Sequence, residues 1–338
     1  MNLAACASLS QGSSEKGQIT VYSALDDKQI DPYLRLFKES HPEIKINLVR
    51  GSTGEITKRL LAERDNPKAD AVWGLAVTSL MFAEWHEILK PYAPEGLERV
   101  SPNFRDSANP PHWVGIDLWM SIFCVNTDLL KELGLPTPQS WQDLIDPAYQ
   151  GYILMPNPNK SGTGYLAVSA VIQLYGDMRG WDYLDKFHDN VADYTDSGVE
   201  SCERVASSEY PIAISYGNEG IRQKASGKPV ETIFPTEGSG WEMEANALID
   251  QQQIKPAAKT FLDWAISYPV MKLYAQHWAV TSIKTDQPVP EGYPEDPRAQ
   301  LIDNAFPWAA ANRLSILAEW KTRYAPTSHT DPDAEVNE

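Results

Sequence analysis

Three short segments rich in Ser, Thr and Gly hold the residues best suited to bind an anion. They are Ser23-Ala24, Ser52-Thr53-Gly54 and Ser161-Gly162-Thr163-Gly164, and each joins a predicted strand to a predicted helix. At such a junction the free N–H groups of the first helical turn, a hydroxyl and the positive end of the helix dipole point to one place. A single Ser or Thr there is usually only an N-cap, but three such turns in one α/β chain favour an oxyanion site.

Four aromatic residues lie near predicted strand ends or in long extended segments: Trp73, Trp119, Tyr216 and Trp241. Most such residues only pack against other apolar groups, so each one taken alone predicts packing. A ligand with a cationic group would give several of them a common role, because an ammonium is attracted to aromatic faces.

Acidic residues interrupt two predicted strands. Asp117 lies in the apolar segment 113–125, and Glu242 and Glu244 alternate with apolar residues in 241–249. A charge on a half-buried strand needs a partner. A ligand ammonium is one such partner, whereas a salt bridge or a solvent-facing side chain explains each residue equally well.

The sequence contains no motif for catalysis. Its six histidines are scattered, with no pair at the helical spacing of metal ligands. Neither G-x-x-x-x-G-K-[ST] nor G-x-S-x-G occurs, so there is no phosphate-binding loop of that type and no nucleophile elbow. We therefore predict no metal, no cofactor and no enzymatic activity.

Composition and charge limit the classes of partner. At 338 residues the chain exceeds the usual size of one core, so we expect two domains. The formal net charge of −17 repels a phosphate backbone and argues against a nucleic-acid partner. An anionic ligand must then be held by local dipoles. No run reaches the roughly 18 to 20 consecutive apolar residues of a membrane-spanning helix.

The three cysteines suggest two kinds of chemistry. Cys6 closes the run Leu3-Ala4-Ala5-Cys6, which resembles a bacterial lipobox, and Ser8 to Gly17 read as a polar tether. The alternative is a chance cysteine, because basic and apolar signal regions do not precede it. Cys124 and Cys202 form one possible disulfide pair, and two buried thiols are the alternative.

Strand and helix patterns alternate from residue 18 onward, which predicts a parallel sheet with helices on both faces. Two extended segments, 113–125 and 241–249, are long enough to run from one lobe into the next. Three helices near the C-terminus, at 256–266, 270–278 and 309–323, are predicted to pack back on the first lobe. The remaining predicted elements are strands at 19–21, 44–48, 69–73, 152–155 and 211–216 and helices at 30–37, 56–61, 78–89, 162–174, 181–188 and 198–207.

Several longer segments carry a family resemblance: VYSAL (21–25), RGSTGEITKRLLAERDNPKADAVWGLA (50–76), MPNPNKSGTGYL (155–166), YTDSG (194–198), SGW (239–241) and WAAANRLSILAEW (308–320). Through them residues 18–325 resemble the type II periplasmic binding proteins of the ferric-binding-protein-like group, and within it the 2-aminoethylphosphonate-binding proteins.

This resemblance implies a clamshell of two α/β lobes joined by two hinge crossings, near Asp117 and Gly240, with the ligand held between the lobes. The implied boundaries are 18–116 plus 240–326 for lobe 1 and 117–239 for lobe 2. A lipobox remnant and tether (1–17) would precede them, and a disordered tail (327–338) would follow. The implied function is the solute-binding component of an ABC importer, a lipid-anchored monomer on the outer face of the cytoplasmic membrane or in the periplasm, which delivers its ligand to a membrane permease.

The resemblance also implies roles for individual residues. The phosphonate would contact Ser23, Ala24, Ser52, Thr53, Gly54, Ser161, Gly162, Thr163, Ser197 and Gly198. Asp117 and Glu242 would pair with the ammonium group, beside Trp73, Tyr216 and Trp241.

One departure from the family pattern bears on the ligand. Relatives carry an aromatic-Glu-Tyr-Arg-Gly run where this chain has Tyr216-Gly217-Asn218-Glu219-Gly220, which removes a cation near the expected anion site. The segment also lacks the adjacent tyrosines of ferric-ion binders. The alternatives are another organophosphate, phosphate, a carboxylate or chelated ferric iron in the same fold, or an envelope hydrolase of phosphonates or phosphate esters.

Overall fold

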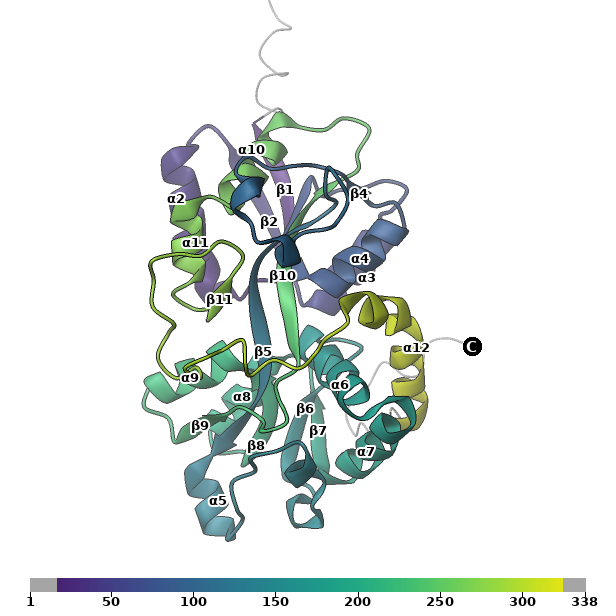
Figure 1. Ribbon diagram of the computed structural model, residues 1–338, viewed down its shortest axis with the longest axis vertical. Coiled ribbons are helices and arrows are strands. Elements are labelled where there is room, and N and C mark those ends of the chain that lie inside the picture. The colour runs from purple at the N-terminus through teal and green to yellow at the C-terminus, as the bar shows by residue number, and fades with distance from the viewer. Residues whose placement is uncertain (1–16, 325–338) are drawn as a thin grey trace, which may run out of the picture. The chain divides into compact units, whose positions relative to one another are not determined.

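The computed structural model describes residues 17–324, which divide into two compact units (Figure 1). Unit 1 comprises the chain up to Leu118 together with Met243–Val289, and unit 2 comprises Trp119–Glu242 and the chain from Pro290. The chain passes between the units inside the two extended segments that we predicted, β5 (Val114–Asn126) and β10 (Trp241–Ile249). It passes a third time between Val289 and Pro290. No helix in 17–324 is long and apolar enough to cross a membrane.

Unit 1 contains three parallel strands in the order β2-β1-β3, and β10 lies antiparallel to β3. Each of the three is followed by a helix, so three helices begin at the same edge of the sheet. Apolar residues such as Ile19 and Val21 are fully buried. The elements are β1 (Gln18–Ser23), α2 (Asp27–Ser40), β2 (Lys45–Arg50), α3 (Thr53–Ala62), β3 (Ala71–Ala76), α4 (Val77–Trp85) and β4 (Leu89–Lys90).

The second part of unit 1 consists of α10 (Pro256–Ala265), α11 (Tyr268–Tyr274) and β11 (Val280–Thr281). As predicted, α10 packs on β1 and β3, and α11 packs on α2. Aromatic rings fill the space between them, with the Trp73 and Phe261 rings 5.5 Å apart in an edge contact.

Unit 2 repeats this plan with the parallel strands β8-β6-β7. The helices α6, α8 and α9 begin at their carboxyl ends, while β5 and then β9 complete the sheet in antiparallel orientation. The elements are α5 (Thr127–Leu133), β6 (Ile153–Pro156), α6 (Gly162–Tyr175), α7 (Asp177–Asn190), β7 (Val191–Thr195), α8 (Gly198–Ala206), β8 (Ile212–Tyr216), α9 (Gly217–Ala225) and β9 (Val230–Ile233).

The last helix, α12 (Phe306–Tyr324), lies in unit 2, whereas we expected it on the first lobe. Its residues Ile316 and Trp320 join the core that contains Trp181 of α7. The Tyr324 hydroxyl donates a hydrogen bond to Asp185 Oδ1 at 2.6 Å, which ties the end of α12 to α7. The sequence predicted the helix at 309–323 but not the unit against which it packs.

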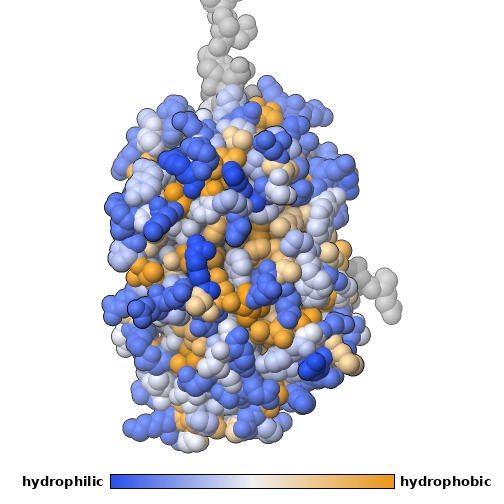
Figure 2. Space-filling view, viewed as in Figure 1, coloured by the Kyte–Doolittle hydropathy of each residue, from blue (hydrophilic) through white to orange (hydrophobic). Residues whose placement is uncertain are grey.

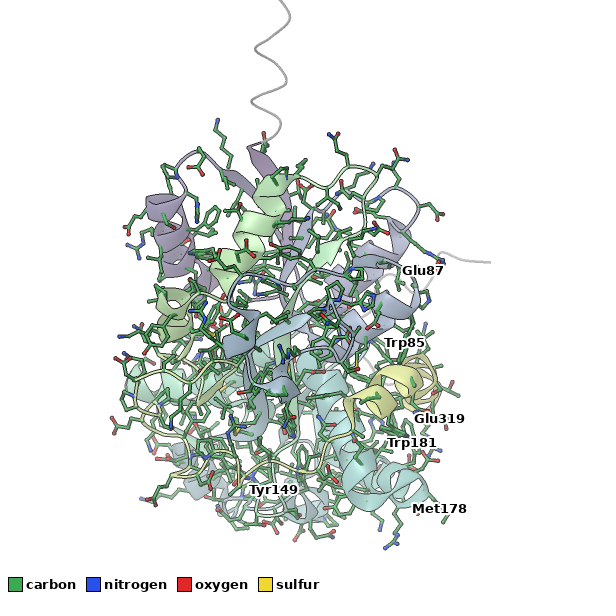
Figure 3. All side chains as sticks on the ribbon, turned by 45° about the horizontal axis from the view of Figure 1, so that its top comes forward. Trp85, Glu87, Tyr149, Met178, Trp181 and Glu319 are labelled. Carbon is green, nitrogen blue, oxygen red and sulfur yellow. A yellow bond between two sulfur atoms is a disulfide. The ribbon has the colours of Figure 1, made fainter. Side chains whose placement is uncertain are left out.

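Hydrophilic residues cover much of the face seen in Figure 2, with apolar residues scattered among them. Among the exposed apolar side chains at helix ends are Trp85, with 51% exposed, and Met178, with 77% (Figure 3). Scattered exposure of this kind is ordinary for a globular protein.

Cys124 and Cys202 form the expected disulfide, which joins β5 to α8 with their Cα atoms 5.6 Å apart. Both residues are fully buried in an apolar cluster with Ile122 and Val205. The predicted lipidation site Cys6, the tether up to residue 16 and the tail 327–338 lie outside the described residues.

Candidate functional site

The N-termini of α6 and α8 meet in unit 2. A Cβ atom placed on Gly198 would lie 2.7 Å from Thr163 Oγ1 and 3.0 Å from Thr163 Cβ. Only glycine permits so close an approach. The strands β6 and β7 pair in parallel, so the two helices that follow them begin side by side at one edge of the sheet. The predicted anion-binding residues of unit 2 are thus brought together.

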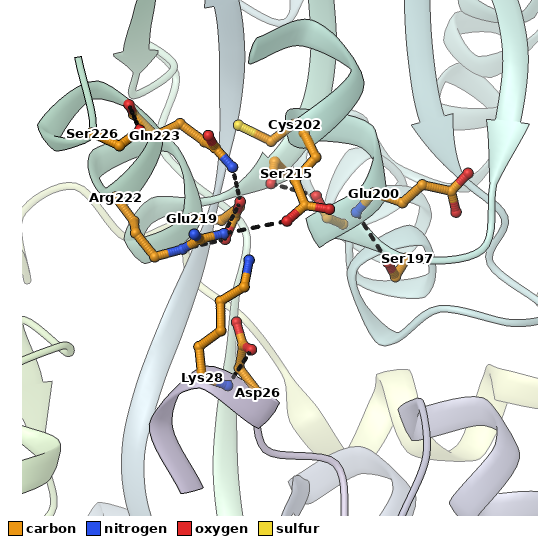
Figure 4. A network of polar contacts seen from close by, with 12 residues as sticks. Asp26, Lys28, Ser197, Glu200, Cys202, Ser215, Glu219, Arg222, Gln223 and Ser226 are labelled. Atoms are coloured by element: carbon orange, nitrogen blue, oxygen red, sulfur yellow. Dashed lines mark hydrogen bonds and ion pairs between the residues drawn. The ribbon is translucent and has the colours of Figure 1, made fainter. Parts of the chain in front are cut away.

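Hydrogen bonds hold both turns in place. Ser161 caps α6 by accepting from the Gly164 N–H at 3.4 Å, and Ser197 caps α8 by accepting from the Glu200 N–H at 3.1 Å (Figure 4). The capping role that we kept as an alternative for these serines is therefore present. A capping hydroxyl uses a lone pair, so its own proton stays available to donate to a ligand.

The turn before α8 has further supports from the strands. The Thr195 hydroxyl donates to the Ser197 carbonyl at 3.0 Å, and the Ser215 hydroxyl donates to the Gly198 carbonyl at 2.7 Å. The Asn157 N–H donates to the Thr195 carbonyl at 2.8 Å, which links the turn after β6 to the end of β7. The start of α8 is therefore fixed before any ligand arrives.

The donors at this junction are well placed for an oxyanion. The first two N–H groups of each helix, at Gly162, Thr163, Gly198 and Val199, have no acceptor in their own helix. The Thr163 hydroxyl makes no hydrogen bond within residues 17–324, and the first turn of α6 contains no acidic residue. Helix dipoles and four amides can then act on one negatively charged group.

Side chains of the protein already form hydrogen bonds at the two predicted anion-binding turns in unit 1. The Ser23 hydroxyl is fully buried and accepts from the Leu25 N–H at 3.2 Å. Ser52 and Glu55 form a capping box, in which the Ser52 N–H donates to Glu55 Oε2 at 2.7 Å and the Glu55 N–H to Ser52 Oγ at 3.3 Å. The helix that starts at Thr53 and Gly54 thus already carries a carboxylate at its N-terminus.

The predicted aromatic residues already have contacts within their own units. Trp73 is fully buried, and its indole N–H donates to the Tyr274 hydroxyl at 2.8 Å. The Trp241 indole N–H donates to the Ile302 carbonyl at 2.9 Å. Tyr216, half-buried, lies edge-on to Trp119 with ring centroids 6.1 Å apart. Ala24 is partly exposed beside Ser23.

Asp117 lies against Glu244 in unit 1, and both side chains are buried. Neither carboxylate oxygen of Asp117, nor Oε2 of Glu244, has a hydrogen-bond donor within residues 17–324. Burial and the Glu244 carboxylate raise the pKa of Asp117 well above its ordinary value, and burial raises the pKa of Glu244 to about 8. Two buried carboxyl groups in contact cannot both ionise, so the pair retains a proton at neutral pH.

Tyr33 borders this acid pair, and the sequence reasoning missed it. Its hydroxyl is buried without a partner in the described chain, and its ring lies edge-on to Tyr274 with centroids 4.9 Å apart. Burial, then Tyr274, Asp117 and Glu244, raise the pKa of Tyr33 well above its ordinary value. The spacing Ile30, Tyr33, Phe37 on one helical face was the available signal.

Glu242 has a different environment from Glu244, although we predicted it as an ammonium acceptor. Arg313 of α12 is buried nearby, and its pKa is lowered by burial while Tyr165 and Glu242 act to raise it. The Arg313 guanidinium carbon lies 4.3 Å from the centroid of the Tyr165 ring. Glu242 therefore has a cation of the protein close by. The sequence reasoning missed Arg313, which falls on the buried stripe Ala309, Arg313, Ile316, Trp320.

Glu219, the unusual residue of the α9 segment, is neutralised by its own helix. It is fully buried, and its Oε2 lies 2.5 Å from Arg222 Nη2. Gln223 Nε2 donates to Glu219 Oε1 at 2.7 Å, and Arg222 also faces Glu203 at 3.6 Å (Figure 4). The departure from the family pattern thus adds no unpaired negative charge at this helix.

Comparisons with known proteins agree with this architecture. An uncharacterized protein of Haemophilus influenzae is 30% identical over 269 residues, which cover 78% of this chain and 77% of that protein. The periplasmic binding protein AfuA from Actinobacillus pleuropneumoniae, solved with exogenous fructose-6-phosphate bound, has a TM-score of 0.84 and 26% identity, over 92% of this chain and 99% of that one. A protein of Salmonella paratyphi A, provisionally named a 2-aminoethylphosphonate-binding periplasmic protein, is 24% identical over 58% of this chain and 56% of that protein.

The predicted fold class is confirmed, because the fold is that of the type II periplasmic binding proteins. The family model described as bacterial extracellular solute-binding protein matches residues 66–308. That match spans most of both units, and this chain therefore belongs to the family of bacterial extracellular solute-binding proteins.

Proposed function

We propose that this chain is the solute-binding component of an ABC importer and that it binds a small organic anion through a phosphonate or phosphate group. The close approach of Thr163 to Gly198 supports this proposal, because the first amides of two helices have no acceptor in their own helix there and the Thr163 hydroxyl makes no hydrogen bond within residues 17–324. The protein carries a net charge of −17, so these short-range donors must act against the overall field.

The preferred ligand is 2-aminoethylphosphonate. A relative provisionally named for that compound supports it, as does Asp117, whose carboxylate oxygens have no protein donor and are suited to accept from an ammonium. We propose the ligand contacts Ser161, Gly162, Thr163, Ser197 and Gly198 in unit 2 as the main anion-binding residues, with Ser23, Ala24, Ser52, Thr53 and Gly54 as secondary ones.

A sugar phosphate is the second candidate, supported by the fructose-6-phosphate bound in the AfuA structure. Both compounds offer a tetrahedral anion to the helix N-termini and differ in the rest of the molecule. A primary ammonium would favour carboxylates, whereas hydroxyl groups would favour mixed donors and acceptors.

Calorimetric titration of the protein separates these candidates. The compounds are 2-aminoethylphosphonate, ethylphosphonate, fructose 6-phosphate, inorganic phosphate and ferric citrate. We expect one-to-one binding of 2-aminoethylphosphonate, at least about tenfold tighter than of ethylphosphonate, which one charge-assisted hydrogen bond can supply. Preferential binding of fructose 6-phosphate would select the second candidate, and preferential binding of ferric citrate would overturn the anion proposal.

A further inference from the structure

A cluster of three potential metal ligands lies in unit 1, apart from the residues discussed above. Glu84 belongs to the last turn of α4, and Asp106 and His112 belong to the loop that leads into β5. Their ligand atoms all lie within 4.8 Å of one another. Within residues 17–324 no other group of three such side chains comes as close.

The loop that carries two of the ligands is held by its own hydrogen bonds. Asp106 Oδ2 accepts from the His112 backbone N–H at 2.9 Å, and Asp106 Oδ1 accepts from the Ala108 N–H at 3.2 Å. The Asp106 N–H donates to the Trp113 carbonyl at 3.2 Å. The Asp106 side chain and the His112 backbone are thus fixed in position without a metal, which lowers the entropy lost on binding one.

The two distances from the His112 ring nitrogen are close to those between neighbouring ligands of a tetrahedral zinc site. His112 Nδ1 lies 2.9 Å from Asp106 Oδ2 and 3.2 Å from Glu84 Oε1. Zinc bonds of about 2.0 to 2.2 Å place neighbouring ligand atoms about 3.3 to 3.5 Å apart. For the two pairs that include His112 Nδ1, an outward shift of a few tenths of an ångström gives this separation, and the two carboxylate oxygens lie within 4.8 Å of each other. The side chains of Glu84 and His112 are each 25% exposed, so solvent can reach the cluster.

A proton on His112 Nδ1 can form a well-aligned hydrogen bond to only one of the two neighbouring carboxylates. One N–H points well at only one acceptor, yet two carboxylate oxygens crowd the same ring nitrogen. The Trp113 indole N–H is 94% buried beside Glu84 and makes no hydrogen bond of good geometry within the described chain. That N–H is placed to orient a metal-bound carboxylate, as outer partners of ligands do.

We propose that Glu84, Asp106 and His112 bind one Zn²⁺ ion, with water as the fourth ligand. Two carboxylates and a neutral imidazole supply charge −2 and a donor set that suits zinc. The ion would link α4 to the loop that enters β5, and so stabilise unit 1. This site is independent of the anion site in unit 2.

The test uses the whole protein without an affinity tag, treated with a chelator and then dialysed. Calorimetric titration with ZnCl₂ is expected to give one site per chain, and excess Zn²⁺ is expected to raise the melting temperature. His112→Ala should lose at least about tenfold in affinity, as for loss of one ligand or its support. The matched control is His86→Ala, because His86 follows α4, its Nδ1 lies 2.8 Å from the Phe82 carbonyl, and it is not one of the three clustered ligands.

Glu84→Gln provides a second variant that keeps the side-chain shape, should His112→Ala fold poorly by circular dichroism. Substitution of Co²⁺ should give the visible absorption of a tetrahedral site in the wild type and in His86→Ala only. Equal zinc affinity in the wild type, His112→Ala and Glu84→Gln would overturn the proposal, and so would the absence of a one-to-one site in the wild type.

Discussion

Units 1 and 2 have the same plan but differ in the side chains at the starts of individual helices. In each unit, three parallel strands end at one edge of the sheet, and a helix begins after each strand. In unit 1 the helix starts are occupied by acidic side chains, with Asp26 capping α2 and Glu55 closing the capping box of α3. In unit 2 the start of α6 has no acidic residue, and its Thr163 hydroxyl makes no hydrogen bond within residues 17–324, although Glu200 lies in the first turn of α8.

The buried carboxylates differ in the same way. In unit 2, Glu219 contacts Arg222, and Glu242 lies near Arg313. In unit 1, the neighbours that interact electrostatically with Asp117 are the acidic Glu244 and the tyrosines Tyr33 and Tyr274. The comparison teaches that topology supplies helix N-termini in both units, and that a few side chains decide which N-termini remain free for an anion. Among the helices compared, only α6 has no acidic side chain at its start, whereas α2 and α3 of unit 1 carry Asp26, Asp27 and Glu55 there, and α8 of unit 2 carries Glu200.

The largest effect that we expect is a pH dependence of stability from the acid pair of unit 1. Burial raises the pKa of Glu244 from 4.5 to about 8, so the folded state holds a proton that the unfolded state releases. This stabilisation is complete below pH 4.5 and is lost as the pH rises through 8. The free energy of unfolding should fall by up to about 1.4 kcal/mol per pH unit in that window. Urea unfolding of the wild type and Glu244→Gln measures it, and the variant should have a smaller slope, because only the buried Asp117 then contributes.

Glu242→Gln is the matched variant for that experiment. It removes a carboxylate two residues away on the same strand, near Arg313 rather than near Asp117. We expect it to keep the pH slope and to lose stability, because Arg313 then has no counter-charge. The same slope in the wild type and Glu244→Gln would contradict the shared proton.

Gly198→Ala should cause the largest loss of ligand binding. The added methyl group meets Thr163, so α6 and α8 must separate, and the amides of the two helices no longer act on one anion. We expect about a 100-fold loss of affinity, equivalent to about 2.7 kcal/mol. Calorimetry measures the affinity and thermal unfolding the stability, since overpacking costs about 1 to 3 kcal/mol. Unchanged affinity in a folded variant would exclude this junction as the anion site.

Thr163→Val and Thr53→Val test the difference between the units with the same chemical change. Each removes one hydroxyl from the first turn of a helix, in α6 and in α3. We expect Thr163→Val to weaken binding about tenfold, since a hydrogen bond to a charged group is worth about 1.5 to 3 kcal/mol. Thr53→Val should change affinity less than about twofold, because Glu55 already occupies that turn. Equal losses would mean that both units bind the anion equally.

Strong hydrophobic periodicity made most of the helices and strands predictable from the sequence. The predicted segment 241–249 coincides with β10, and 162–174 falls one residue short of α6. By contrast, α9 was missed, since two glycines in GNEGIRQKA lower its helical propensity and packing on β9 compensates. The short strand β7 was missed as well, because its alternation is weak.

The site was less predictable than the fold, because its geometry depends on strand order. The sequence identified Ser161, Thr163 and Ser197 as candidates, but the contact of Thr163 with Gly198 follows from the pairing of β6 with β7. Likewise, the alternation of Glu242 and Glu244 placed both on one strand face, and nothing local indicated that one has a basic neighbour and the other an acidic one.

The smallest effect that we expect distinguishes a capping serine from one that also binds the ligand. Ser52 and Ser161 both cap helices, so replacing either by Ala should cost about 1 kcal/mol of stability. The cost should be larger for Ser52, which exchanges two hydrogen bonds with Glu55, than for Ser161, whose one capping bond is 3.4 Å long. Affinity should respond in the opposite order, falling a few-fold in Ser161→Ala and remaining unchanged in Ser52→Ala, because only Ser161 has a hydroxyl proton facing a helix start free of carboxylates. Parallel thermal unfolding and calorimetry of the two variants measure both quantities, and a loss of affinity in Ser52→Ala alone would assign the anion to unit 1.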